Sequence, residues 1–127
     1  MKKVLAAFTV IALIAFSSCR KDELPAPAPA ASVDINVEYR ITSESGHVTG
    51  SYLAPENGVM VEKQFAIDRT NFSFPFQWKS GQKLMIKASN ALSSGKEVKV
   101  DIYVNSQLFR SGSANAPGTV AVAEGSY

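Results

Sequence analysis

The sequence predicts an all-β domain, and three observations support this assignment. Apolar and polar residues alternate with a period of two along several runs, which is typical of strands with one buried face. Pairs of turn-forming residues separate these runs. No stretch after residue 32 keeps a helical repeat of 3.6 residues for three turns. We therefore expect residues 33–127 to fold as one β-sandwich of seven or eight short strands.

Two runs show the clearest alternation. Apolar side chains at every second position from Val33 to Ile41 are separated by polar ones, and the run from Val98 to Val104 repeats the pattern. Such a strand turns one set of side chains to the core and the other to water. The other expected strands are shorter, and they cover residues 48–54, 58–66, 71–77, 83–90, 107–111 and 119–123.

Turn residues lie where hairpins need them. Asn57-Gly58 separates two expected strands, and both residues tolerate the positive φ angles of a type I′ turn. We expect Asn105-Ser106 to turn the Val98 strand back into the run that begins at Gln107. The other expected corners are Ser45-Gly46, Ser80-Gly81, Ser94-Gly95 and Pro117-Gly118.

Four aromatic residues recur at every second position of one expected strand: Phe72, Phe74, Phe76 and Trp78. They share one face, and we expect this face to lie in the core, because large rings supply much of the burial that a small sandwich needs. The alternative is an exposed platform for sugar rings, in which Trp78 is the ring expected at the surface. Pro75 has no N–H to donate, so it predicts an edge or bulged strand here.

A short apolar segment opens the chain. Lys2 and Lys3 precede the uninterrupted apolar run of residues 4–16, and the small residues Ser17 and Ser18 follow it. This order is typical of a secretory signal peptide, and 13 apolar residues are too few for a membrane-spanning helix, which needs about 20. We expect residues 1–18 to be cleaved from the mature protein.

Cys19, the only cysteine, follows this segment directly and has no partner for an internal disulfide. The sequence Phe16-Ser17-Ser18-Cys19 resembles a bacterial lipobox of the looser kind found in Bacteroidetes lipoproteins, with Phe in place of the usual Leu. The resemblance implies that Cys19 is acylated on sulfur, becomes the new N-terminus and is usually acylated there too. The alternative is ordinary cleavage after Ser17, which would leave Cys19 as a free thiol.

The four charged residues after the cysteine are Arg20, Lys21, Asp22 and Glu23. They resemble the surface-export signal of Bacteroidetes lipoproteins, which implies a lipid-anchored protein on the outer face of the outer membrane. The alternatives are a solvated charge cluster near lipid headgroups and a location on the periplasmic face.

Residues 19–32 are expected to link this anchor to the domain. Proline occupies every second position from Pro25 to Pro29, and each proline fixes its own φ and favours extended geometry in its predecessor. The segment from Leu24 to Ser32 is therefore expected to form polyproline II, which spans about 28 Å at ~3.1 Å per residue.

The charge of the mature chain excludes one class of partner. Of the 13 Lys and Arg residues, Lys2 and Lys3 leave with the signal peptide, so 11 basic residues face 11 acidic ones. A chain without a basic excess has no electrostatic basis for binding nucleic acid.

The order of features in the domain carries a second resemblance. Tyr39-Arg40-Ile41-Thr42 is followed by Gly50-Ser51-Tyr52-Leu53, the Asn57-Gly58 turn, Phe74-Pro75-Phe76 with Trp78, the segment 84–90, and Val98 to Asn105. This order resembles the small β-sandwich of MmpS-like membrane proteins. The resemblance implies an immunoglobulin-like sandwich and an accessory role beside large envelope transporters. The chain departs from the family in four ways: Trp78 does not follow the proline directly, Asn105-Ser106 replaces the acidic-Gly hairpin, the late cysteine pair is missing, and a lipid anchor is expected in place of a membrane helix.

The residues offer little for catalysis. His47 is the only histidine, and no Gly-x-Ser-x-Gly motif accompanies it. Glu38 and Asp101 are both expected at exposed strand positions, without the apolar shielding that separates the pKa values of a glycosidase pair. No ligand set for a metal and no glycine-rich phosphate loop is found. We expect neither an enzyme nor a cofactor.

The sequence therefore predicts a non-catalytic lipoprotein of the outer membrane, with a binding or accessory role in the cell envelope. The alternative is a surface glycan-binding lipoprotein that uses exposed aromatic rings, Trp78 first among them. Its partners would be the membrane through the lipid anchor, and an envelope protein or a glycan.

Overall fold

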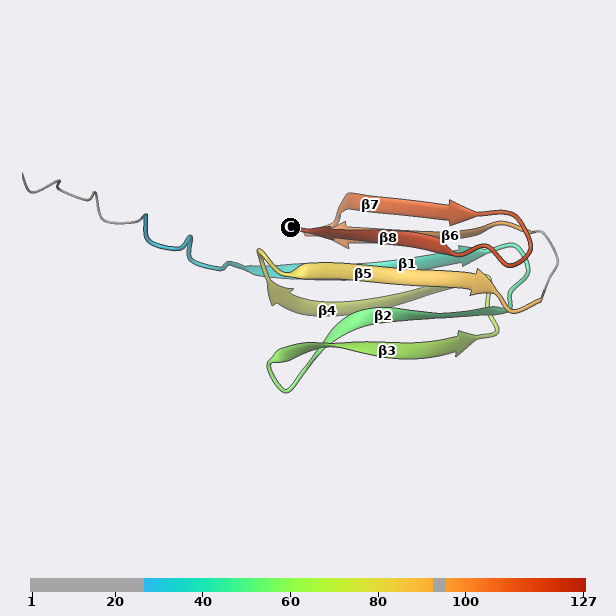
Figure 1. The fold of residues 1–127 in the computed structure, drawn as a ribbon, viewed down its shortest axis with the longest axis horizontal. Coiled ribbons are helices and arrows are strands. Elements are labelled where there is room, and N and C mark those ends of the chain that lie inside the picture. The colour runs from blue at the N-terminus through green and yellow to red at the C-terminus, as the bar shows by residue number, and fades with distance from the viewer. Residues whose placement is uncertain (1–26, 93–95) are drawn as a thin grey trace, which may run out of the picture.

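The computed structural model describes residues 27–92 and 96–127, and eight strands form two antiparallel sheets in them (Figure 1). One sheet has the order β4-β1-β6-β7 and the other has the order β3-β2-β5-β8. The prediction of an all-β fold is confirmed. The strands are β1 (Asp34–Ser43), β2 (Val48–Glu56), β3 (Val59–Ile67), β4 (Asn71–Lys79), β5 (Lys83–Asn90), β6 (Val98–Val104), β7 (Gln107–Ala114) and β8 (Ala121–Ser126).

The expected hairpin turns form as the residue types predicted. Asn57 and Gly58 have φ angles of 51° and 80°, and Asn105 and Ser106 have φ angles of 49° and 68°. Positive φ at both central positions is the geometry of a type I′ turn, whose twist matches that of the flanking strands. The expected Ser94-Gly95 corner and the anchor residues 19–23 lie outside the described residues.

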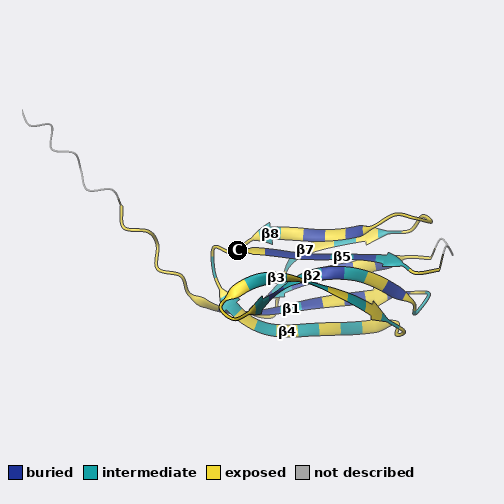
Figure 2. Cartoon of the chain, turned by 60° about the horizontal axis from the view of Figure 1, so that its bottom comes forward, coloured by how far each residue is buried: buried dark blue, intermediate teal, exposed yellow. Residues whose placement is uncertain are grey.

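The core lies between the two sheets and is built by the alternating faces of the strands. Buried and exposed residues alternate along β1, as the bands in Figure 2 show. The largest side chains that are fully enclosed come from β1, β5 and β6, and the largest four are Tyr39, Leu84, Ile86 and Ile102. Burial of such apolar area is the main favourable contribution to folding.

The two lateral sides of the sandwich are closed in different ways. On one side, β7 approaches β8 so closely that a side chain on Gly112 would collide with the backbone carbonyl of Val122. On the other side, rings from both sheets fill the space between β3 and β4. Tyr52 stacks on Phe74 with centroids 4.3 Å apart, and Phe65 lies 5.6 Å from the same ring.

The repeated aromatic residues of β4 face inward. Phe74, Phe76 and Trp78 are half-buried and pack against the core, and Phe72 lies 4.7 Å from Phe74. β4 forms the edge of its sheet, as Pro75 predicted. The core interpretation of these rings is supported over that of an exposed platform.

The linker enters the sandwich at the end where the chain also terminates (Figure 1). Residues 27–33 are exposed and belong to no strand. Within residues 27–92 and 96–127, the structure contains no helix with the length and hydrophobicity needed to cross a membrane.

Candidate functional site

The outer face of β4-β1-β6 carries a row of polar side chains. On β1 the row consists of Asn36, Glu38, Arg40 and Thr42, which point away from the core. In the antiparallel register they lie beside Gln77, Pro75, Ser73 and Asn71 of β4. Outward positions recur about every 7 Å along a strand, so this row extends over about 20 Å from Asn36 to Thr42.

Two adjoining hollows follow this row and share Glu38. The first has a volume of about 300 Å³, and its lining includes Asn36, Glu38, Pro75, Gln77, Tyr103 and Ser106. The second has a volume of about 440 Å³, and its polar lining comes from Glu38, Arg40, Thr42, Arg69, Asn71 and Ser73. We call the two hollows together the β1-β4 groove.

Hydrogen bonds hold the side chains of the first hollow in place. The amide of Gln77 donates to Oδ1 of Asn36 at 3.2 Å. The backbone N–H of Asn36 donates to Oδ1 of Asn105 at 3.0 Å, and the N–H of Asn105 donates to the carbonyl of Asn36 at 2.8 Å. The β6-β7 turn, which also carries Ser106, is thereby fixed against the start of β1.

A charged network joins the two hollows. Arg40 donates to Glu38 at 2.8 Å, and its guanidinium lies 4.1 Å from the centre of the Tyr103 ring. The hydrogen bond from Arg40 holds the pKa of the Glu38 carboxyl below its ordinary value, so this group stays ionised in mildly acidic solution. The groove therefore presents a fixed carboxylate beside a fixed cation.

The structure corrects one expectation about this face. Asp101 lies at an outward position of β6, as expected, but it is only 7% exposed. Its carboxylate accepts a hydrogen bond from the Ser111 hydroxyl at 2.5 Å and forms an ion pair with Lys99 at 3.2 Å. Its neighbours on β6 and β7 cover it, a contact between strands that the alternation pattern does not reveal. Glu38 and Asp101 thus lie on one face, with Arg40 directly opposite Asp101 in the register.

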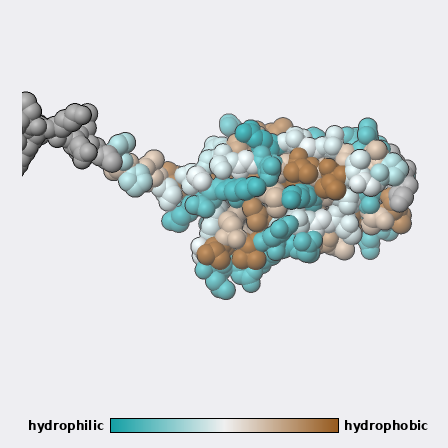
Figure 3. Space-filling view, viewed as in Figure 1, coloured by the Kyte–Doolittle hydropathy of each residue, from teal (hydrophilic) through white to brown (hydrophobic). Residues whose placement is uncertain are grey.

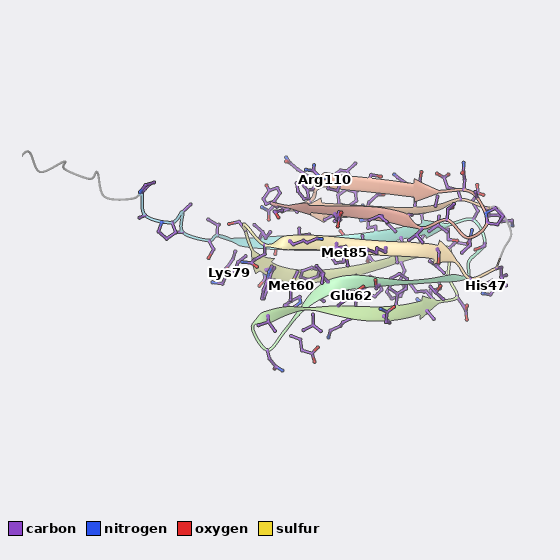
Figure 4. All side chains as sticks on the ribbon, in the orientation of Figure 1. His47, Met60, Glu62, Lys79, Met85 and Arg110 are labelled. Carbon is purple, nitrogen blue, oxygen red and sulfur yellow. The ribbon has the colours of Figure 1, made fainter. Side chains whose placement is uncertain are left out.

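Trp78 lies away from the groove, on the inner face of β4. Its ring packs against the core, and Nε1 is buried without a hydrogen-bond acceptor among the described residues. The ring also borders a hollow of about 370 Å³ at the linker end, together with Met60 and Lys79 (Figure 4). Burial of the indole nitrogen contrasts with the expectation that Trp78 is the ring that reaches the surface.

His47 lies at the end of the sandwich opposite the linker (Figure 4). Its Nδ1 lies 2.8 Å from a carboxylate oxygen of Asp68, and its side chain is 49% exposed. The hydroxyl of Ser45 bonds to the backbone of His47, to the amide oxygen of Asn90 and to the hydroxyl of Ser43. This network ties the loops at that end together. Among residues 27–92 and 96–127, no group of three or more His, Cys, Asp or Glu side chains is placed to hold a metal ion.

The opposite sheet offers a different surface. Its outer face, toward the viewer in Figure 3, shows hydrophobic residues as small separate patches between hydrophilic ones. Two residues of this sheet are covered by their neighbours: Met85 and Ser51 are each 6% exposed, and the Ser51 hydroxyl donates to Glu62 at 2.6 Å. The apolar residues that do reach this surface are separated from one another (Figure 3). Scattered apolar residues of this kind are ordinary for a protein surface.

Comparison with protein-family models finds no match for this chain, and comparison with curated proteins finds no significant match. The assignment of a binding surface therefore depends on the geometry of the residues themselves. The resemblance to MmpS-like proteins stays a prediction.

Proposed function

We propose that this chain is a non-catalytic lipoprotein of the outer membrane, and that the β1-β4 groove binds an extended glycan. The observation that supports a binding role is the groove: a row of fixed amide, carboxylate, hydroxyl and guanidinium groups about 20 Å long on an exposed sheet face. Side chains held in place before binding lose less conformational entropy when a ligand binds.

The chemistry of the groove favours a glycan over a peptide strand. The amides of Asn36 and Gln77 each offer a donor and an acceptor, and the Glu38 carboxylate adds acceptors, which suits the neighbouring hydroxyl groups of a sugar. A peptide strand that extended this sheet would have to pair with the edge of β4. Pro75, in the middle of β4, has no backbone N–H to donate to an added strand, which disfavours peptide binding by strand addition.

The binding role is tested with variants of the groove. Calorimetric titration of the purified protein against a panel of polysaccharides should detect binding, which Gln77→Ala and Tyr103→Ala should weaken at least tenfold. Gln64→Ala, on the exposed part of β3 in the other sheet, is the matched control and should leave the affinity unchanged. Trp78→Phe should also leave it unchanged, which separates the groove from the earlier hypothesis that Trp78 contacts the ligand.

The result that contradicts this proposal is the absence of binding across the panel. If crosslinking on intact cells then recovers an envelope transporter, the accessory role implied by the MmpS-like resemblance is the better account.

The anchor is tested separately. Growth with a clickable palmitate analogue should label the protein and not its Cys19→Ala variant, and the variant should leave the membrane fraction. Protease added to intact cells should remove the domain if it lies on the surface. Protection of the domain until the outer membrane is opened would place it on the periplasmic face. If residues 20–23 are the export signal, their replacement by alanine should protect the domain from protease added to intact cells.

A further inference from the structure

We propose that the glycan bound by the β1-β4 groove is acidic, and that Arg69 binds its carboxylate. This inference rests on the proposed function, because it names the class of ligand for the same groove.

The two hollows differ in charge. The first contains one carboxylate, from Glu38, and no cationic side chain among its lining residues. The second is lined by Arg40 and Arg69 as well as by Glu38. Its remaining polar lining consists of the neutral side chains Thr42, Asn71 and Ser73. Because Glu38 and Arg40 compensate each other, Arg69 makes the second hollow the basic end of the groove.

The two guanidinium groups are used differently. Arg40 is 2.8 Å from Glu38 and stacks on Tyr103, so its charge is already compensated. Arg69 forms no salt bridge with any described residue, and the neighbouring carboxylate of Asp68 is bonded to His47 instead. An arginine fork matches the geometry of a carboxylate and can bind it through two parallel hydrogen bonds.

The position of Arg69 fits a substituent on a ligand that lies along the groove. Arg69 belongs to the short connection between β3 and β4, at the end of the groove farthest from Asn36 and Gln77. A chain of sugars whose hydroxyl groups reach Asn36 and Gln77 would continue over Glu38 and Arg40 toward Arg69. The uncompensated cation there selects a sugar that carries a negative charge.

The experiment compares one polymer in two forms. The probes are a linear polyuronate and the same polymer after its carboxyl groups have been reduced to alcohols, and binding is measured by titration calorimetry in 0.15 M salt. We expect the polyuronate to bind about tenfold more tightly than the reduced polymer. Arg69→Gln should remove this difference. Arg110→Gln removes an arginine from β7, outside the groove, and should keep the difference.

The outcomes separate this inference from the proposed function. Equal affinity of the natural protein for both polymers would overturn the acidic preference and leave the glycan-binding role standing. Failure of both polymers to bind, together with failure across the neutral panel, would reject the glycan-binding role and the inference with it. Polyglutamate serves as a peptide probe: binding as tight as that of the polyuronate, with the same loss in Arg69→Gln, would show that the groove recognises acidic chains in general and would overturn the assignment to glycans.

Discussion

The hydroxyl of Tyr39 crosses the core of the sandwich and accepts a hydrogen bond from the backbone N–H of Met85 at 3.2 Å. Tyr39 lies on β1 in one sheet, and Met85 lies on β5 in the other. The ladder between β2 and β5 ends at the pair Tyr52 and Ile86, so the N–H of Met85 lies just beyond it. The Tyr39 hydroxyl, which comes from the opposite sheet, accepts a hydrogen bond from this buried N–H. The bond therefore links the two sheets at the point where the pairing of β2 with β5 ends.

Replacement of Tyr39 by phenylalanine should lower the free energy of unfolding by about 1–3 kcal/mol, because it leaves the N–H of Met85 buried without an acceptor. Urea unfolding, followed by circular dichroism, measures this change. Tyr127→Phe is the control: Tyr127 is 46% exposed, and the change should stay within about 0.5 kcal/mol. Equal stability of the two variants would mean that water reaches Met85 and that the bond between the sheets contributes little.

Tyr39 also makes the protein sensitive to high pH. Burial raises the pKa of its phenol well above the ordinary value of 10.0. The unfolded chain therefore loses this proton at a pH where the folded protein keeps it, and stability, complete below about pH 10, falls as the pH rises further. Absorbance at 295 nm should show that one of the four tyrosines ionises only when the protein unfolds. Ionisation of all four before the change in circular dichroism would contradict the burial of Tyr39.

Gly112 should tolerate no side chain, because β7 lies against β8 at this position. Gly112→Ala forces the backbone of β7 away from Val122, and we expect a loss of stability of about 1–3 kcal/mol, as for other overpacked sites. Thermal unfolding of Gly112→Ala and of the exposed neighbour Ser113→Ala provides the comparison. A melting temperature of the glycine variant equal to that of the serine variant would show that the two strands can separate at no cost.

Lys63 protects the exposed edge strand β3. It lies opposite Tyr52 in the register of β2 and β3, so it shares the inner face of this edge strand with the aromatic rings, and it forms an ion pair with Glu56 at 3.3 Å. A charge that points inward on an edge strand discourages pairing with other chains. We expect Lys63→Val to increase self-association, measured by light scattering at rising protein concentration. Lys83→Val, on β5, is the control, and equal association of both variants would assign the effect to net charge alone.

The indole nitrogen of Trp78 should contribute nothing favourable to stability, because it is buried without an acceptor among the described residues. Trp78→Phe keeps most of the ring and removes the unpaired donor, so we expect a change within about 1 kcal/mol. Trp78→Ala removes the packing as well and should cost about 2 kcal/mol or more. Similar large losses in both variants, measured by urea unfolding, would indicate that Nε1 has a bonding partner in solution.

The candidate site was only partly visible in the sequence. The alternation along β1 gave the outward positions of Asn36, Glu38 and Arg40, but not which strands lie beside them. The aromatic spacing in β4 favoured an inner face for Trp78 and its neighbouring rings, and Trp78 does pack against the core. Arg69 carried no signal at all, because a single arginine in a connecting segment resembles any other surface charge. Only the pairing of β4 with β1 places Arg69 beside Arg40.

The sequence by itself determined the class of fold, the approximate bounds of all eight strands and the turns at Asn57-Gly58 and Asn105-Ser106. These features depend on local properties: the alternation of apolar residues, and the φ angles that each residue type tolerates. The tertiary structure alone decided the strand order, the burial of Asp101, the bond between Tyr39 and Met85, and the groove. Those features join residues far apart in the chain, and the free energy that selects one pairing over another comes from packing across both sheets, which no single strand contains.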